Sequence, residues 1–201
     1  MKNQLAPLII VSGPSGVGKT TVVDALLRRT PLPLRRAITA TTRPIREGER
    51  PGFDYYYWTR EEFERAVHAN QMLEWAEVFG MDYYGTPLSE VIPYRQNGVG
   101  VILVIDVQGA ARVRELIPDS ISVFIRPPNL EELETRLRKR GDLTEDRIRR
   151  RLETARNELA RVCEFDHEII NDQLSEAVSR LEDVISREYR DCQCGKSCMP
   201  N

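Results

Sequence analysis

Short, nearly continuous apolar runs recur along the chain and alternate with segments whose apolar positions have a helical spacing. The run "LIIVS" over residues 8–12 stops at a glycine and is followed by "KTTVVDALLRR" over 19–29, which predicts a strand, a loop and a helix. Runs at 101–107 and 120–125 are nearly continuous in apolar residues, as is typical of parallel strands covered on both sides. A short strand is predicted at 167–171.

Helical patterns separate and follow these strands. They cover residues 108–116, 129–141, 144–162 and 175–190, and the second opens with Asn129 as an N-cap and Glu132 three residues later. Strands that alternate with helices predict an α/β fold with a mainly parallel core sheet covered by helices.

Residues 36–95 interrupt this alternation. They contain short aromatic strands and a helix from residue 60, which Thr59 and Glu62 open as a capping box. We therefore expect one domain over 1–201, with a core of 5–35, 96–135 and 152–190, an inserted subdomain at 36–95 with a small mixed sheet, a helical lid at 136–151, and a flexible tail at 191–201.

Composition and charge exclude some classes of protein. The net charge of -2 gives no overall reason to expect nucleic acid or membrane as a partner, and no run reaches the roughly 18 apolar residues of a spanning helix. The first residues lack a signal-peptide pattern, so a cytoplasmic location is expected. Only four of the 29 basic residues are lysines, and the excess of arginine either reflects codon usage or indicates anionic ligands.

Three of the four cysteines crowd the end of the chain. Cys192, Cys194 and Cys198 have the spacing C-x-C-x3-C, which matches no standard zinc site. A frayed, reduced tail is the favoured interpretation, and binding of a soft metal is the alternative.

The segment "GPSGVGKT" after the first strand is a phosphate-binding loop. Its glycines allow backbone N–H groups to face an anion, and the helix that follows adds its dipole. We expect Lys19 to reach the β- and γ-phosphates of ATP and Thr20 to bind Mg²⁺. The predicted ATP-binding residues here are Gly13, Pro14, Ser15, Gly16, Val17, Gly18, Lys19, Thr20 and Thr21. The loop alone does not identify the phosphoryl acceptor.

Arginines run into four consecutive aromatics in "TTRPIREGERPGFDYYYW", residues 41–58. Prolines and glycines break this segment, so Arg43 and Arg46 can converge on one anion. A surface hairpin whose aromatics pack on the core is the alternative. Stacking on single-stranded nucleic acid is disfavoured because Glu47, Glu49 and Asp54 lie among the basic residues.

The segment "TTRPIREGERPGFDY" resembles the acceptor signature of the guanylate kinase family. "EWAEVFGMDYYGT", "IDVQGA", "RLRKRG", "RRRLETARNELARV" and "FDHEIIND" follow in the family's order, so that the resemblance extends from residue 8 to about residue 189. It implies reversible transfer of the γ-phosphoryl group of MgATP to GMP and to dGMP, and it leaves both a monomer and a homodimer open. Because guanine presents two adjacent N–H donors that one carboxylate can accept, Glu74 fits the family's guanine-reading glutamate.

The resemblance also implies roles for individual residues. GMP would be bound by Thr39, Arg43, Arg46, Glu49, Tyr55, Glu74, Tyr84, Thr86 and Asp106. Arg136, Arg140 and Arg151 would close over the triphosphate and, with Lys19 and Arg43, form the catalytic set, and Asn171 would lie near the adenine. Lys139, Arg149 and Arg150 are expected to be surface residues.

One position departs from the family pattern. Val104 stands where an acid usually precedes the aspartate of "IDVQG" by two residues, and strand packing is one reason for a valine there. This departure keeps a P-loop kinase with another phosphorylated acceptor as an alternative. A non-catalytic interaction module of the same family is the other alternative, and the intact phosphate loop and lid arginines argue against it.

Overall fold

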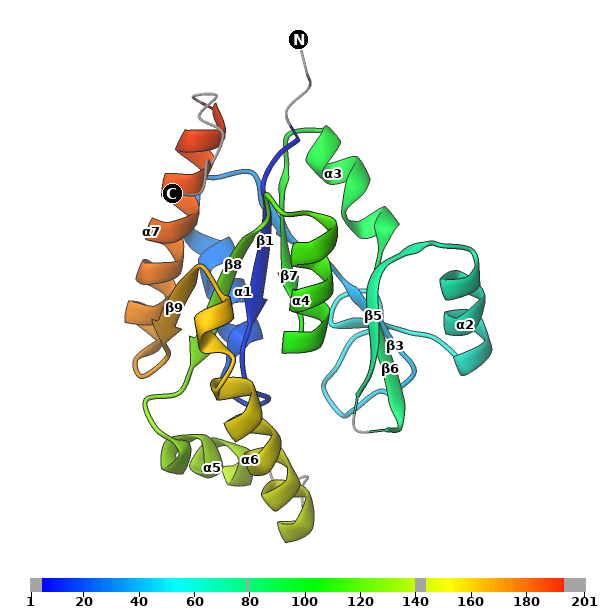
Figure 1. Ribbon diagram of the computed structural model, residues 1–201, viewed down its shortest axis with the longest axis vertical. Helices are drawn as coiled ribbons and strands as arrows, with labels where there is room; N and C mark the ends of the chain where they lie inside the picture. The colour runs from blue at the N-terminus through cyan, green and yellow to red at the C-terminus, as the bar shows by residue number, and fades with distance from the viewer. Residues whose placement is uncertain (1–4, 79, 140–143, 194–201) are drawn as a thin grey trace.

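The computed structural model describes residues 5–78, 80–139 and 144–193, with side chains up to Arg190 (Figure 1). The strands are β1 (Leu8–Ser12), β2 (Leu34–Arg36), β3 (Thr39–Thr41), β4 (Tyr55–Tyr57), β5 (Met72–Val78), β6 (Asp82–Pro87), β7 (Gly100–Val104), β8 (Ile121–Arg126) and β9 (His167–Ile170). The helices are α1 (Lys19–Arg29), α2 (Arg60–His68), α3 (Ile92–Gln96), α4 (Val107–Leu116), α5 (Leu130–Lys139), α6 (Glu145–Leu159) and α7 (Leu174–Gln193), with 3-10 turns η1 (Leu88–Glu90) and η2 (Val162–Glu164).

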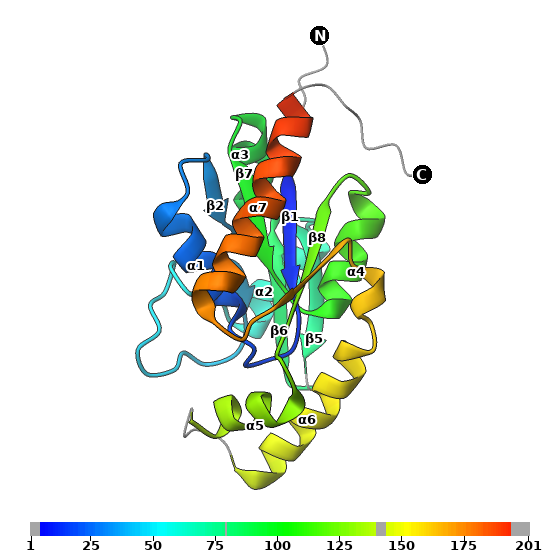
Figure 2. The same cartoon turned by 90° about the vertical axis from the view of Figure 1, so that its left-hand side faces the viewer.

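The core is a five-stranded sheet in the order β2-β7-β1-β8-β9, and all its pairs are parallel. Helices α1 and α7 cover one face and α4 covers the other (Figure 2). Alternate residues of the central strand β1 serve these two faces, so Ile9 packs with α1 and α7 while Ile10 packs with α4. The predicted α/β fold is confirmed. The apolar runs predicted it because strands buried on both faces need apolar residues throughout.

Residues 39–87 form the second sheet, in the order β4-β3-β6-β5, which holds both parallel and antiparallel pairs. Helix α2 packs on it through the fully buried Phe63, whose ring lies 6.5 Å from that of Trp75. The predicted capping box is confirmed, since the Thr59 hydroxyl accepts from the Glu62 N–H and the Glu62 carboxylate accepts from the Thr59 N–H. This acceptor subdomain lies to one side of the core in Figure 1.

A buried carboxylate joins the acceptor subdomain to the core. Glu90 is 6% exposed and accepts hydrogen bonds from Arg35 Nη2 at 2.6 Å, the Ile38 N–H at 3.0 Å and Tyr56 Oη at 2.9 Å. Arg35 also lies over the ring of Tyr94, 3.6 Å from its centroid. Because these donors come from β2, from the β2–β3 connection and from β4, Glu90 fixes both chain segments where they enter the subdomain.

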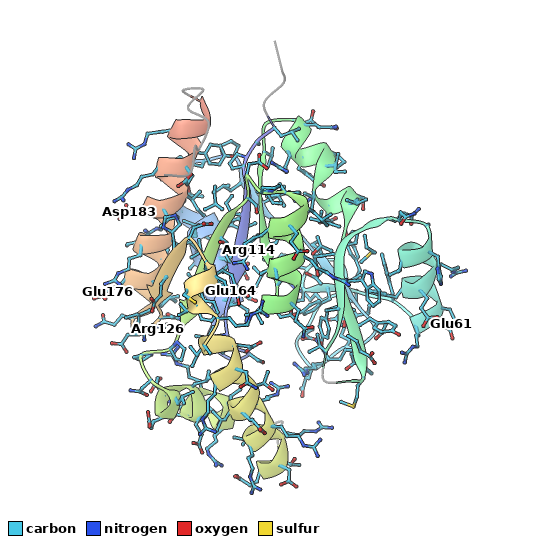
Figure 3. All side chains as sticks on the ribbon, in the orientation of Figure 1. Glu61, Arg114, Arg126, Glu164, Glu176 and Asp183 are labelled. Carbon is cyan, nitrogen blue, oxygen red and sulfur yellow. The ribbon has the colours of Figure 1, made fainter. Side chains whose placement is uncertain are left out.

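The segment predicted as a lid contains the end of α5 and the start of α6, which project beyond the core sheet at the bottom of Figure 1. The Asn129 side chain accepts from the Glu132 N–H at 2.7 Å, as expected for an N-cap. At the other end of α6, η2 is held to α4 by the ion pair between Arg114 and Glu164, which lie together in Figure 3. The base of α6 is therefore fixed to the core, whereas its first turns extend away from it.

Several predicted boundaries shift. The strand expected over 101–107 ends at Val104, because the carboxylate of Asp106 caps α4 by accepting from the Gln108 and Gly109 N–H groups at 3.0 and 2.8 Å. The helix expected over 144–162 ends at Leu159, and the exposed Cys163 lies in η2. Helix α7 continues to Gln193, so residues 191–193 of the predicted tail are helical.

The alternative of a soft-metal site in the tail involves Cys194 and Cys198, which lie outside the described residues, as does Arg140. Within the described ranges, no group of three or more His, Cys, Asp or Glu side chains is arranged to hold a metal ion. A search of the same ranges finds no helix that is both long enough and apolar enough to span a membrane.

Candidate functional site

A cavity of about 590 Å³ opens beyond the carboxyl ends of β1 and β7, where the phosphate loop, the acceptor subdomain and α6 meet. Parallel α/β sheets bind ligands at this edge, because the loops that follow the strands converge there. The predicted site residues that line the cavity are Gly13, Ser15, Gly16, Gly18, Lys19, Thr20, Thr21, Thr39, Arg43, Arg46, Glu49, Tyr55, Glu74, Tyr84, Asp106 and Arg151. Residues far apart in the sequence are thus brought to one space.

The phosphate loop is closely packed on β8. Gly13 has φ of 136°, and a Cβ added there would lie 2.0 Å from the carbonyl oxygen of Ile125. Gly18 caps α1 in the left-handed region, with φ of 98°. Lys19 Nζ donates to the carbonyls of Gly13 and Pro14 at 2.6 and 3.0 Å, so the ammonium group lies inside the curve of the loop. Backbone N–H groups and a cation therefore surround a space suited to phosphate oxygens.

The remaining predicted ATP-side residues support the loop from behind. Asn171 is 6% exposed, and its Nδ2 donates to the Val17 carbonyl at 2.7 Å. Arg136 donates to the same carbonyl at 3.3 Å and pairs with Glu132 within α5. Val17 and Asn171 are both buried. In this structure Asn171 therefore contacts the phosphate loop, and its predicted place near the adenine stays a prediction.

Helix α6 contributes one face to the cavity. Arg151 Nη1 donates to the Ser15 hydroxyl at 3.4 Å, and Thr154 and Glu158 line the cavity from the next two turns. Burial raises the pKa of Glu158 to about 7, although the charge of Lys19 opposes this shift. The sequence reasoning missed Glu158 and Thr154, yet their spacing of three and seven residues from Arg151 would have placed all three on one helical face.

Arg43 and Glu49 form an ion pair in the acceptor half of the cavity. Arg43 is 8% exposed and its Nη2 donates to both carboxylate oxygens of Glu49, at 2.8 and 3.0 Å. Burial by itself would lower the pKa of Arg43, but the hydrogen bonds to Glu49 and Tyr84 raise it. Glu49 also accepts from the Arg46 N–H and from Tyr57 Oη, both at 2.8 Å, so the loop is folded around this carboxylate.

Two tyrosines flank Arg43. Tyr84 Oη accepts from Arg43 Nε at 3.1 Å, and the ring of Tyr55 lies 5.5 Å from the guanidinium carbon. The rings of Tyr55 and Tyr84 make an edge-on contact at 6.0 Å. Burial raises the pKa of Tyr55, which keeps its hydroxyl a neutral donor. Arg43, Arg46, Tyr55 and Tyr84 thus all line one cavity, and their binding of one anion stays a prediction.

Glu74 lies deeper in the acceptor half. It is 5% exposed, and its Oε1 accepts from the Thr86 hydroxyl at 2.7 Å. Burial raises its pKa to about 7, and the nearby Asp106 adds to that shift. A Cβ at Gly109 would lie 2.7 Å from Glu74 Oε2, so the glycine leaves room for the carboxylate. Thr86 is fully buried behind Glu74, while Thr39 reaches the cavity from β3.

Val104 and Asp106 line the cavity. Val104 is half-buried at the end of β7, and it packs against the core cluster while it also reaches the cavity surface. Asp106 is committed to the α4 N-terminus through one oxygen, Oδ1. Lys139, Arg149 and Arg150 are exposed, as expected for surface residues.

Comparisons with known proteins agree with this geometry. The family model "Guanylate kinase" matches residues 6–188. The chain is 46% identical over 178 residues to the guanylate kinase of Synechococcus sp. (strain JA-3-3Ab), covering 89% of this chain and 81% of the relative. It is 47% identical over 184 residues to that of Corynebacterium glutamicum, covering 91% and 96%. The crystal structure of guanylate kinase from Anaplasma phagocytophilum superimposes with a TM-score of 0.78 at 32% identity, covering 92% of this chain and 87% of that one.

Proposed function

The chain belongs to the guanylate kinase family, and on that premise we propose that it transfers the γ-phosphoryl group of ATP to a phosphate oxygen of GMP, giving ADP and GDP. The observation that supports this most directly is that Lys19 of the phosphate loop lines the same cavity as Arg43 and Glu74 of the inserted subdomain. Such a cavity has one site for a triphosphate and a second for a nucleotide with a guanine base.

Arg43, Arg46, Tyr55 and Tyr84 bind the acceptor phosphate in this proposal. The guanidinium groups supply charge and paired donors, and the hydroxyls supply neutral donors. Glu49 is a positioning residue, since its two oxygens orient Arg43 before any ligand arrives. An acceptor phosphate enters a site that is already cationic and ordered, so little free energy is lost in arranging it.

Glu74 selects guanine. As a carboxylate it accepts from N1–H and the N2 amino group, while the Thr86 hydroxyl fixes Oε1. Adenine offers an acceptor where guanine has the N1–H donor, so the buried carboxylate would lose its partner. Thr39 and Asp106 line the same half of the cavity and complete the predicted GMP site.

The phosphate loop, Lys19 and the lid arginines bind ATP. Lys19 stabilises the β- and γ-phosphates, Arg151 approaches from α6 over Ser15, and Arg136 and Asn171 hold the loop through Val17. Arg140 remains a predicted lid residue outside the described ranges. Thr20 is exposed to the cavity from the first turn of α1, and its hydroxyl is an oxygen ligand that suits Mg²⁺ beside phosphate oxygens. When bound, Mg²⁺ neutralises charge on the triphosphate.

The transfer needs no general base, because the attacking oxygen belongs to a phosphate that is already ionised. The protein contributes position and charge. The acceptor clamp, which consists of Arg43, Arg46, Tyr55 and Tyr84, aligns GMP. Lys19 and Arg151 stabilise negative charge on the transferred group. Closure of the acceptor subdomain and the lid would exclude water and limit hydrolysis of ATP.

A coupled assay that measures ADP formation tests the proposal with GMP, dGMP, AMP and UMP as acceptors. GMP should give the highest kcat/KM, and Val104→Asp, which restores the family's acid, serves as a comparison for acceptor affinity. Rapid phosphorylation of another monophosphate with no GDP formed would assign a different acceptor. Absence of ATP binding by calorimetry would instead indicate a non-catalytic module. A cytoplasmic location stays a prediction that fractionation checks, and light scattering would distinguish a monomer from a homodimer.

A further inference from the structure

A fourth arginine of the cavity, Arg36, joins the core to the acceptor loop. It is the last residue of β2, and its Nε donates to Asp24 Oδ1 on α1 at 3.1 Å. Its Nη2 donates to the Phe53 carbonyl at 3.1 Å. The Arg36 side chain is 12% exposed and lines the cavity. Two of the three guanidinium nitrogens are therefore used to connect α1 with the loop before β4.

The turn that Arg36 binds is closed by its own hydrogen bonds. The Arg50 N–H donates to Asp54 Oδ2 at 2.8 Å, and the Phe53 and Asp54 N–H groups donate to the Arg50 carbonyl at 3.2 and 3.0 Å. The Gly52 N–H donates to the Tyr55 carbonyl at 2.9 Å. Because the turn is internally fixed, a bond to one of its carbonyls restrains the turn as a unit, including the start of β4 at Tyr55.

We propose that Arg36 is a positioning residue for the acceptor phosphate, acting through this turn on Tyr55. This inference rests on the proposed function, in which Tyr55 donates to that phosphate. Asp24 orients Arg36, Arg36 holds the Phe53 carbonyl, and the turn sets the position of the Tyr55 ring beside Arg43 and Tyr84.

The connection has a consequence for phosphoryl transfer. Asp24 lies one turn along α1 from Thr20 and Thr21, which line the donor half of the cavity. Helix α1 therefore fixes the donor phosphates at its first turn and, through Asp24 and Arg36, the acceptor clamp at its second. Transfer in line needs a defined separation between the two phosphates, so a single helix that positions both supplies that geometry.

Arg36→Met and Asp24→Ala test the connection from its two ends, and Arg28→Met removes an exposed cation from the same helix as a matched control. Steady-state kinetics and calorimetry give the KM and Kd for GMP and for ATP. We expect Arg36→Met to raise both GMP constants about tenfold, because a charge-assisted hydrogen bond is lost. Asp24→Ala should raise them in the same direction by a smaller factor, while ATP constants change less than about twofold and Arg28→Met matches the parent.

Guanosine separates positioning of the phosphate from general damage to the subdomain. It lacks the phosphate but keeps the base that Glu74 reads, so its Kd should be unchanged in Arg36→Met. Equal losses for guanosine and GMP would show a merely structural role and overturn the inference. In a double-mutant cycle, Arg36→Met should weaken GMP binding much less when Tyr55→Phe is already present. If the effects of Arg36→Met and Tyr55→Phe on the free energy of GMP binding were fully additive, the inference would be overturned.

Two further outcomes would also overturn the inference. If Arg36→Met weakened GMP binding and Asp24→Ala did not, Arg36 would be a direct phosphate ligand. Parent-like GMP constants in Arg36→Met would remove any role in acceptor binding. Failure of the proposed function is distinguishable, because then the parent protein itself would make no GDP from GMP.

Discussion

Glu49 holds Arg43 through both carboxylate oxygens, at 2.8 and 3.0 Å, and the remaining guanidinium nitrogens of Arg43 donate to Tyr84 Oη and to the Pro44 carbonyl. Every nitrogen of the group is thus oriented before a ligand is present. In the proposed site, an entering phosphate would exchange some of these partners without moving the side chain, so little free energy would be lost in ordering it.

Charge removal or reversal at Arg43 should therefore raise the KM for GMP much more than the KM for ATP. We expect Arg43→Met to raise the KM for GMP by about ten- to a hundredfold, and Arg43→Glu to raise it further, since a charge-assisted hydrogen bond is lost. The KM for ATP should change less than about threefold. Steady-state kinetics measure both constants, with the exposed Arg65→Met of α2 as a control. Equal effects on the two substrates would count against an acceptor clamp.

Binding of GMP should depend on the protonation of Glu74, whose pKa is raised to about 7 by burial. Only the carboxylate accepts both guanine donors, so the Kd for GMP should weaken about tenfold as the pH falls from about 8 to 6. Calorimetry over this range measures it. The GMP phosphate also titrates near pH 6, and Glu74→Gln isolates that contribution because it lacks the carboxylate. An unchanged pH dependence in Glu74→Gln would refute the assignment.

The same carboxylate should limit the stability of the ligand-free protein. The folded-state pKa of Glu74 is raised to about 7 from 4.5, so its favourable contribution is complete below about pH 4.5 and is lost as the pH rises through about 7. Relative to the parent, the free energy of unfolding of Glu74→Gln should therefore increase by about 2 kcal/mol from pH 5 to 8. Urea unfolding at several pH values checks this. A difference that is constant with pH would contradict it.

Glu90 should be important for stability even though it lies outside the cavity. Glu90→Ala leaves Arg35, the Ile38 N–H and Tyr56 Oη without their shared acceptor. The expected loss is about 2–4 kcal/mol in the free energy of unfolding, since removing one member of a buried ion pair leaves the charge of the other uncompensated. Glu64→Gln breaks an exposed pair with Arg60 and should cost less than about 1 kcal/mol. Similar losses in the two variants would argue against Glu90 as an anchor.

Removal of the Lys19 charge should lower the rate of phosphoryl transfer and leave the affinity for GMP nearly unchanged. We expect Lys19→Met to lower kcat at least a hundredfold, because transition-state charge on the transferred group loses its closest fixed cation. The Kd for GMP should stay within about twofold of the parent value, since Lys19 donates to the carbonyls of Gly13 and Pro14 and so lies within the phosphate loop. Single-turnover kinetics and calorimetry separate the two effects. A parallel loss of GMP affinity would mean that the two halves of the cavity are not independent.

The sequence by itself determined the parallel core, the phosphate loop and the capping signals. Apolar runs such as "LIIVS" are required where a strand is buried on both faces, and the glycine-rich loop is required where backbone must approach an anion. The cap residues Asn129 and Thr59 act within four residues, so the chain shows them directly. The resemblance to a known family added residues whose roles no local pattern reveals, such as Glu74.

Only the tertiary structure decided which side chains share a space and what that does to their charge. Glu158 lies close to the phosphate loop because α5 and α6 return the chain across the cavity, and its burial there raises its pKa. Arg36, Asp24 and the Phe53 carbonyl come from three separate elements, as do the donors that meet at Glu90. Hydrogen bonding and desolvation depend on distances between segments far apart in the chain, and periodicity along one segment carries no information about those distances.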